Sequence, residues 1–152
     1  MKPEYFLLIV FILLILIIYV AMAKGERKKL TLLNSDGKKV YVDAELADNS
    51  TTKMKGLMGR QSLGRNEGML FKFDKEQIQS FWMFNVTIPL DAVFFDSKGK
   101  VVDVIQMEPC GLNMTKCRLY APQKPSMYVL EVNKGFAKNN SIAVGKSSLE
   151  LS

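Results

Sequence analysis

The stretch NSDGKKVYVDAEL, residues 34–46, decides the fold class of this 152-residue chain. It opens with Asn34-Ser35-Asp36-Gly37, residue types that favour a tight turn because they tolerate left-handed backbone or hydrogen-bond to it. From Val40 to Leu46, apolar and polar side chains alternate, as they do on a strand with one buried face. Together with the apolar segment Leu30–Leu33 before the turn, this pattern predicts a β-hairpin.

Further strands are indicated at intervals of roughly ten residues. Apolar runs or alternation predict strands at residues 69–73, 91–96, 101–107 and 128–132, with a weaker last strand at 144–151. The segment 91–107 is predicted to form a second hairpin. Because this hairpin is apolar on both faces in places, we expect it to lie centrally in the sheet.

One short helix is expected between the first hairpin and the strand at residues 69–73. Candidate N-caps at residues 49–52 precede Met54, Leu57 and Met58, which form an apolar stripe that closes near Gly59. We therefore predict an α+β domain over residues 30–152. Its architecture is expected to be a mostly antiparallel β sheet or small open barrel with one or two short helices.

The N-terminal residues 1–23 differ in composition from the rest. Tyr5 to Ala23 is an unbroken apolar run of 19 residues, which as a helix matches the roughly 30 Å thickness of a bilayer core. We predict a transmembrane signal-anchor at residues 1–23, followed by a linker at 24–29. Ala21-Met22-Ala23 also has the form of a signal peptidase site, so cleavage after Ala23 stays open.

Different residues give opposite indications of the side of the membrane on which the C-terminal domain lies. Basic residues at positions 24–29 follow the apolar run, and the positive-inside rule alone would place the domain in the cytoplasm. Cys110 and Cys117, the only cysteines, lie in a Pro/Gly-bearing loop and favour a disulfide in an oxidising compartment. Four glycosylation sequons point the same way, beginning at Asn49, Asn85, Asn113 and Asn139. We predict a single-pass membrane protein with its C-terminal domain outside the cytoplasm.

The composition excludes several function classes. The chain has no histidine, which excludes Ser-His-Asp and Cys-His nucleophiles and histidine-ligated metal sites. The net charge is +6, but the basic residues are dispersed and no basic-aromatic motif is present, so we expect no nucleic-acid partner. The cysteine spacing is not Cys-x-x-Cys, which favours a structural bond over a redox pair or half a metal site. We expect no cofactor and no metal.

Seven methionines beyond the apolar run leave one alternative open. Thioethers bind Cu(I), so a copper-handling protein is conceivable. Filling of the core by flexible methionine side chains is the simpler explanation. The residues concerned are Met54, Met58, Met69, Met83, Met107, Met114 and Met127.

Three sequence blocks carry a family resemblance. They are GLMGR at residues 56–60, GMLF at 68–71, and FWM at 81–83 continuing to IPLD at 88–91. The cysteine loop, residues 109–122, and the YVLEVNKG block, residues 128–135, follow in order. From about Val40 to Leu149, the chain resembles the domain of unknown function 192 family, whose members are small and often extracytoplasmic or membrane-anchored. The resemblance implies a compact, mostly β fold and no established activity. Phe84 departs from the lysine that many relatives have after the Trp-Met pair, which puts a cation at that position in doubt.

The blocks also supply the candidate ligand-binding residues Arg60, Trp82, Asn85 and Asp91. Arg60 leaves a tight turn and can bind a carboxylate, either on a ligand or within the fold, where Asp91 is the natural partner. Trp82 and Asn85 can form an aromatic pocket wall with a polar orienting group, or a core tryptophan beside a loop-fixing amide. No catalytic residue is assigned.

The sequence therefore favours a non-enzymatic role, in which the domain binds a small ligand, glycan or protein partner at the cell envelope. The enzyme alternative is a carboxylate-based hydrolase that uses Asp91 and a second acidic residue. The carboxylates on or beside predicted strands are Asp91, Asp96, Asp103, Glu108 and Glu131. The copper-handling alternative would use the methionines.

Overall fold

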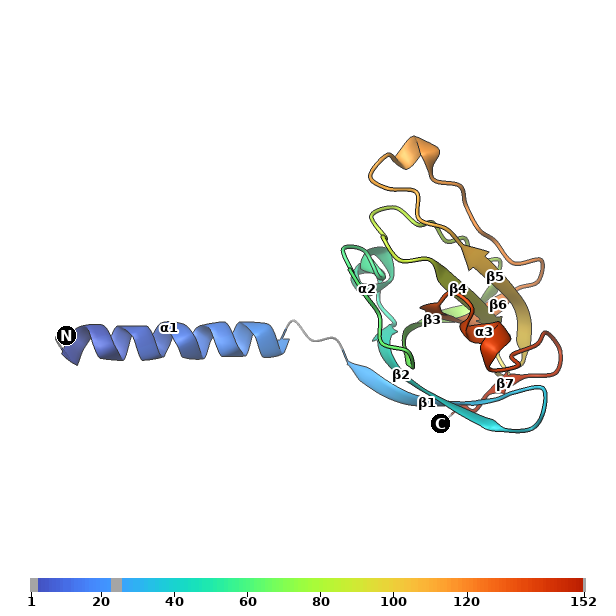
Figure 1. Ribbon diagram of the computed structural model, residues 1–152, viewed down its shortest axis with the longest axis horizontal. Helices are drawn as coiled ribbons and strands as arrows, with labels where there is room; N and C mark the ends of the chain where they lie inside the picture. The colour runs from blue at the N-terminus through green and yellow to red at the C-terminus, as the bar shows by residue number, and fades with distance from the viewer. Residues whose placement is uncertain (1–2, 23–25, 152) are drawn as a thin grey trace.

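The computed structural model describes residues 3–22 and 26–151 (Figure 1). An N-terminal helix, α1 (Pro3–Met22), stands apart from a domain built on one curved sheet. The predicted cleavage point after Ala23 and the basic residue Lys24 lie outside the described residues.

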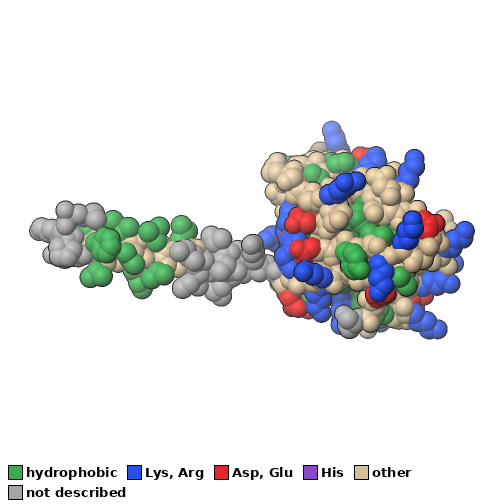
Figure 2. Space-filling view, turned by 60° about the horizontal axis from the view of Figure 1, so that its bottom comes forward, with side chains coloured by type: hydrophobic (Ala, Val, Ile, Leu, Met, Phe, Trp, Pro, Cys, Tyr) green, Lys and Arg blue, Asp and Glu red, His purple; other side chains and the backbone are tan. Residues whose placement is uncertain are grey.

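From Tyr5 to Leu16, the part of α1 whose side chains the structure describes, the helix is apolar on all sides and exposed (Figure 2). Among the residues whose side chains the structure describes, no helix is both long enough and apolar enough to cross a membrane. A helix is present within the predicted segment 1–23, and its function as an anchor stays a prediction.

The domain is mostly β and contains one seven-stranded mixed sheet in the order β5-β4-β6-β3-β2-β1-β7. Neighbouring strands are antiparallel except β2 and β3, which are parallel. The sheet is thus mostly antiparallel, as predicted, with one parallel pair that the sequence did not indicate. The segment between these two strands contains α2 and a turn and is long enough to return the chain to the same end of the sheet. The bounds are β1 (Arg27–Leu33), β2 (Lys39–Ala47), β3 (Glu67–Gln77), β4 (Leu90–Phe95), β5 (Val101–Met107), β6 (Ser126–Asn133) and β7 (Ser148–Leu149).

The sheet curves into a half-barrel, and its last strand, β7, contacts both β1 and the chain at the start of β5. β7 pairs with β1, while the Leu149 N–H donates to the Gly99 carbonyl (2.7 Å) and the Val101 N–H donates to the Ser147 carbonyl (3.0 Å). Gly99 has φ +79°, and a Cβ there would lie 2.3 Å from the Leu149 carbonyl oxygen. Only glycine allows the two edges to approach this closely.

Both predicted hairpins are present. In the first, the Asn34 side chain accepts hydrogen bonds from the Asp36 and Lys38 N–H groups (3.0 and 2.8 Å), and β1 begins at Arg27, inside the predicted linker. In the second, β4 is buried along its whole length between β5 and β6, as expected for a central strand. β5 was expected to be central as well, but it lies at the end of the strand order.

Within its described residues, the domain has two short α-helices, within the predicted number, but the first is shorter than expected. α2 (Ser50–Lys55) is capped by Asn49 as predicted, but it ends at Gly56, whose φ of +47° leaves Leu57 and Met58 beyond the helix. A second helix, α3 (Phe136–Asn139), follows β6, and a single 3-10 turn, η1 (Met114–Lys116), lies in the cysteine loop.

Buried apolar side chains pack against both faces of the sheet. The face that carries α3 is covered by the α3-side core, which includes Val93, Val132, Phe136 and Ala137. The opposite face is covered by the α2-side core, with members Ala47, Leu57, Met69, Phe71, Phe81, Met83, Val86, Leu90, Ala92, Phe94, Met107, Tyr120 and Val129. The sheet is thus covered by side chains and loops on two sides.

The methionines divide between core and surface. Met69, Met83 and Met107 are buried, as the core-filling interpretation predicts. Met54 and Met114 are 76% and 55% exposed, so core filling does not explain them.

The predicted disulfide between Cys110 and Cys117 is present, with a Cα–Cα distance of 5.2 Å. Cys110 packs against the α2-side core, so the bond fixes one end of the cysteine loop to the domain.

Candidate functional site

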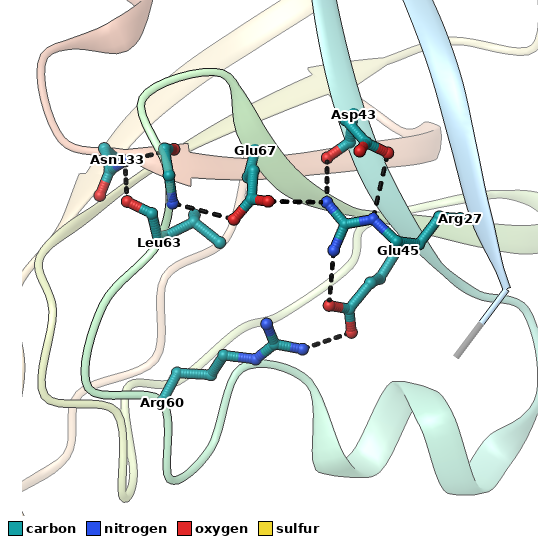
Figure 3. Close-up of polar contacts among 8 residues, drawn as sticks. Arg27, Asp43, Glu45, Arg60, Leu63, Glu67 and Asn133 are labelled. Atoms are coloured by element: carbon teal, nitrogen blue, oxygen red, sulfur yellow. Dashed lines mark hydrogen bonds and ion pairs between the residues drawn. The ribbon is translucent and has the colours of Figure 1, made fainter. Parts of the chain in front are cut away.

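Arg60 pairs with Glu45 of β2 and not with Asp91 (Figure 3). The Glu45 side chain is 15% exposed and the Arg60 side chain 33% exposed, so the pair is partly open to solvent. The expected Arg60–Asp91 pair is therefore wrong. Arg60 is a scaffold contact between the GLMGR block and the sheet, and a ligand contact by its remaining donors stays a prediction.

Glu45 belongs to a larger charge network centred on Arg27, the first residue of β1. The Arg27 guanidinium lies 3.1 Å from Asp43, 3.2 Å from Glu45 and 3.1 Å from Glu67 (Figure 3). These carboxylates raise the pKa of Arg27 above its ordinary value, mainly through the hydrogen bond to Asp43. Arg27 thus connects three strands.

The same network holds the turn between the GLMGR block and β3. Glu67 accepts a hydrogen bond from the Gly64 N–H (3.0 Å), while the Asn133 amide donates to the Leu63 and Gly64 carbonyls (3.0 Å each) (Figure 3). The turn is therefore attached both to the charged cluster and to the end of β6.

Asp91 lies on the opposite face of the sheet. It pairs in register with Val132, a member of the α3-side core, and its carboxyl accepts a hydrogen bond from the Ala137 N–H at 2.9 Å. Asp91 is 1% exposed, and its second carboxyl oxygen has no hydrogen-bond partner among the described residues. Asp91 therefore fixes the start of α3 and cannot share a site with Arg60.

Asn85 connects two blocks through its main chain. Its φ is +55°, its N–H donates to the Gly111 carbonyl (3.0 Å), and its carbonyl accepts from the Gly59 N–H (2.8 Å). No hydrogen bond joins its amide to the Trp82 indole in the described part of the chain. Asn85 fixes the loop as expected, but it does so through backbone groups and a left-handed conformation that asparagine tolerates.

Trp82 lines a cavity of about 40 Å³ on the α2 side of the sheet. The GLMGR, GMLF and FWM blocks form its walls together with α2, and the YVLEVNKG block supplies Glu131. The lining residues are Lys53, Met54, Lys55, Gly56, Leu57, Met58, Phe71, Phe81, Trp82, Val86 and Glu131. Since Lys55 is exposed and Glu131 buried, the cavity runs inward from the surface at α2.

Glu131 is the polar group inside this cavity. It lies on β6 between Met69 of β3 and Ala92 of β4, is 5% exposed, and has no hydrogen-bonding or charged partner among the described residues. Burial alone raises the pKa of Glu131 from 4.5 to about 8, because an ionised carboxylate loses its hydration there. The raised pKa favours the protonated carboxylic acid at neutral pH.

Asp91 and Glu131 do not form the carboxylate pair that a hydrolase would need. Glu131 pairs with Ala92 in the α2-side core, whereas Asp91 faces the α3-side core. The remaining strand carboxylates have local contacts. Asp96 and Asp103 accept main-chain hydrogen bonds, and Glu108 pairs with Lys134.

Glu131 was not placed in the predicted site, although its signal is in the sequence. It is the single acidic residue in the apolar run Tyr128–Val132, which was predicted to be a strand. An acidic side chain in the middle of such a run has no solvent-facing alternation to explain it.

Comparison with known proteins places these blocks in one family. Residues 31–148 match the model of DUF192, described as an uncharacterised ACR. The chain belongs to the DUF192 family. The matched range includes every segment that lines the cavity and does not include α1. It confirms the resemblance found in the sequence.

Two UPF0127 proteins are similar in sequence. One, from Pyrococcus furiosus, is 25% identical over 114 residues, which cover 72% of this chain and 87% of that protein. The other, from Pyrococcus abyssi, is 30% identical over 101 residues, which cover 66% of this chain and 80% of that protein.

Two solved structures have a fold similar to that of this chain. One is a candidate transcription regulator from Sinorhizobium meliloti, with a TM-score of 0.75 and 26% sequence identity. The alignment covers 84% of this chain and 95% of that chain. The other is a protein of unknown function from Novosphingobium aromaticivorans, with a TM-score of 0.75 and 28% sequence identity. The alignment covers 85% of this chain and 88% of that chain.

Replacement of Asp91 should destabilise the domain more than replacement of Arg60. Asp91→Ala leaves the buried Ala137 N–H unpaired, which costs about 1–3 kcal/mol. Arg60→Ala should cost about 1 kcal/mol or less, because its pair is partly exposed and Glu45 keeps Arg27 as a partner. Urea unfolding of both variants measures the difference. Asp91→Asn is the control, since its amide oxygen can still accept. A larger loss for Arg60→Ala would contradict this assignment.

Glu131 should make stability fall as pH rises. The unfolded chain loses this proton near pH 4.5 and the folded chain near 8, so between these values the folded state binds more protons. The free energy of unfolding then decreases by at most about 1.4 kcal/mol per pH unit from this group. Glu131→Gln removes that contribution. Unfolding of both proteins from pH 5 to 9 should show Glu131→Gln gaining relative to wild type, and parallel profiles would disprove the assignment.

Proposed function

We propose that this protein is a binding protein that holds a small terminal group of its ligand in the cavity between Trp82 and Glu131. The observation that carries the proposal is the convergence of separate sequence blocks on one buried, unpartnered carboxyl. The Glu131 carboxyl lines the cavity and has no hydrogen-bond partner among the described residues. A ligand that hydrogen-bonds to Glu131 would supply that partner, which gives binding a physical reason at this place.

The arrangement supports binding better than hydrolysis by two carboxylates. The second strand carboxylate, Asp91, lies on the other face of the sheet and is engaged with Ala137. The raised pKa of Glu131 also favours its protonated form at physiological pH, whereas a carboxylate nucleophile or base must be ionised.

We further propose that residues 1–23 anchor the protein in a membrane and that the domain lies outside the cytoplasm. The apolar run Tyr5–Ala23 and the exposed side chains of α1 support an anchor, and the Cys110–Cys117 bond supports an oxidising compartment. Arg27 is engaged by three carboxylates, so the exposed Lys28 and Lys29 are the basic residues of β1 available to lipid head groups.

Ligand binding can be tested through Trp82, the only tryptophan of the chain. The full chain in detergent micelles would be titrated with small amines, carboxylates, amides and monosaccharides while tryptophan emission is recorded. We expect at least one class to shift the emission saturably, and Glu131→Met to weaken that response about tenfold or more by removing the polar group. The exposed variant Asp74→Asn is the control and should respond as wild type. Absence of any saturable response would rule out the cavity as a binding site.

The proposed topology predicts which part of the chain a protease can reach. Protease added to intact spheroplasts should digest the domain and leave the apolar segment protected by the bilayer. Immunoblotting against the C-terminus measures the loss of the domain. Full protection until the membrane is opened would show that the basic residues at positions 24–29 determine the orientation and that the domain is cytoplasmic.

A further inference from the structure

Helix α2 carries the most exposed large apolar side chain in the part of the chain that the structure describes. Met54 is 76% exposed, and packing in the core does not explain it. It lines an open hollow of about 360 Å³ together with Ser50, Thr51, Lys55 and Met58. An apolar hollow on a protein surface marks a candidate interaction site. We call the group formed by Lys53, Met54, Lys55 and Met58 the α2 surface.

The charge of α2 is positive. Its sequence, STTKMK, contains two lysines and no acidic residue. The Lys53 ammonium lies 4.9 Å from the centre of the Phe73 ring, and Lys55 is exposed. Neither lysine forms an ion pair within the described residues, and Asp48 is the one acidic residue in the segment 47–60. Apolar surface beside unpaired cations is complementary to a bilayer with anionic head groups, which offers acyl chains and negative charge together.

α2 lies near the end of the domain that is joined to α1. Glu26 is the first described residue of the domain, and its carbonyl accepts a hydrogen bond from the Leu46 N–H at 2.8 Å. β2 ends at Ala47, and α2 begins three residues later at Ser50. Figure 1 shows α2 on the same side of the domain as the start of β1. The α2 surface is therefore close to the point where the domain is attached to the N-terminal helix.

The connection between α1 and the domain is short. α1 ends at Met22, so residues 23–25 alone separate it from Glu26. The four Cα–Cα steps from Met22 to Glu26 span at most about 14 Å. With residues 1–23 as the proposed membrane anchor, on which this inference rests, Glu26 must lie within that reach of the helix end. The head-group layer there is about 5–8 Å deep, so the adjoining side of the domain lies at or beside it.

We propose that the α2 surface docks on the head-group layer of the membrane that holds α1, with a preference for anionic lipids. The two methionines enter the boundary between head groups and acyl chains, and the two lysines lie among the anionic head groups. α2 is already formed in the domain, because Asn49 and Thr52 make a capping box at its N-terminus. Docking therefore requires little ordering of the chain.

The test places a fluorophore on the full chain in lipid vesicles. The chain has two cysteines, which are bonded to each other, so Met54→Cys can be labelled alone. The control is Val144→Cys, an exposed apolar position in the turn between α3 and β7. The vesicles contain phosphatidylcholine and phosphatidylglycerol, with a nitroxide quencher on some head groups. We expect quenching at position 54 to exceed that at position 144 at least about threefold, because only the first label would lie in the head-group layer.

Insertion and docking are measured separately. Retention of the chain in the vesicles after alkaline carbonate extraction reports whether α1 is embedded, and quenching reports where α2 lies. Equal quenching at the two positions in an embedded chain would overturn the docking, leave the anchor standing and assign the apolar hollow to a protein partner. Release of the chain by carbonate would overturn the anchor and the docking together.

Charge variants test the lysines of the α2 surface. Lys53→Gln/Lys55→Gln should reduce the quenching at position 54, because each lysine near an anionic surface contributes up to about fivefold to binding. Lys98→Gln/Lys100→Gln is the matched control, since it removes the same charge from exposed positions between β4 and β5, and it should leave the quenching unchanged. Equal reductions in the two variants would reduce the effect to net charge and overturn the role of α2.

Lipid composition gives an independent readout. Vesicles of phosphatidylcholine alone should give weaker quenching at position 54 than vesicles that also contain phosphatidylglycerol. Added salt should remove the difference, because exposed charges are screened within about 10 Å at 0.1 M ionic strength. Quenching that is equally strong in the neutral vesicles would overturn the preference for anionic lipids.

Discussion

The burial of one carboxyl on a central strand is the constraint on which the rest of this structure depends. β6 lies between β3 and β4, so Glu131 has a neighbouring strand on each side. A hydrogen-bond partner can therefore reach its carboxyl only from the face of the sheet. α2, the GLMGR block and the FWM block cover that position, and they leave a small cavity there. The separate blocks that define the family in sequence thus have one common neighbour in space.

The cover over Glu131 is held by main-chain bonds as well as by the Arg60–Glu45 pair. Asn85 joins the GLMGR block to the cysteine loop, and Phe81 pairs with Tyr120 through two main-chain hydrogen bonds (2.8 and 2.9 Å). The Cys110–Cys117 bond closes the part of the cysteine loop that contains Gly111, and Tyr120 follows shortly after it. The cover is therefore attached at several points, which favours a preformed cavity over one that assembles on binding.

Local patterns in the sequence predicted the local elements well. The turn residues and alternation of residues 34–46 predicted the first hairpin, and the disulfide followed from two cysteines in a short loop. The parallel β2–β3 pair and the place of β5 at the end of the sheet were not predictable in the same way, because both depend on pairing between distant segments. The choice of Asp91 as partner for Arg60 failed for the same reason. The alternation of side chains along a strand shows that Asp91 and Val93 lie on the same face of the sheet. Only the register between strands shows that Arg60 lies on the opposite face.

The central claim is that Glu131 is a neutral, unpartnered acid at physiological pH. Carbon-13 NMR of the side-chain carboxyl carbon, assigned by comparison with Glu131→Gln in selectively labelled full-length protein, tests it most directly. The account predicts the chemical shift of a protonated carboxyl at pH 7 and a titration midpoint near 8. A carboxylate shift at pH 7 with a midpoint near 4.5 would contradict it.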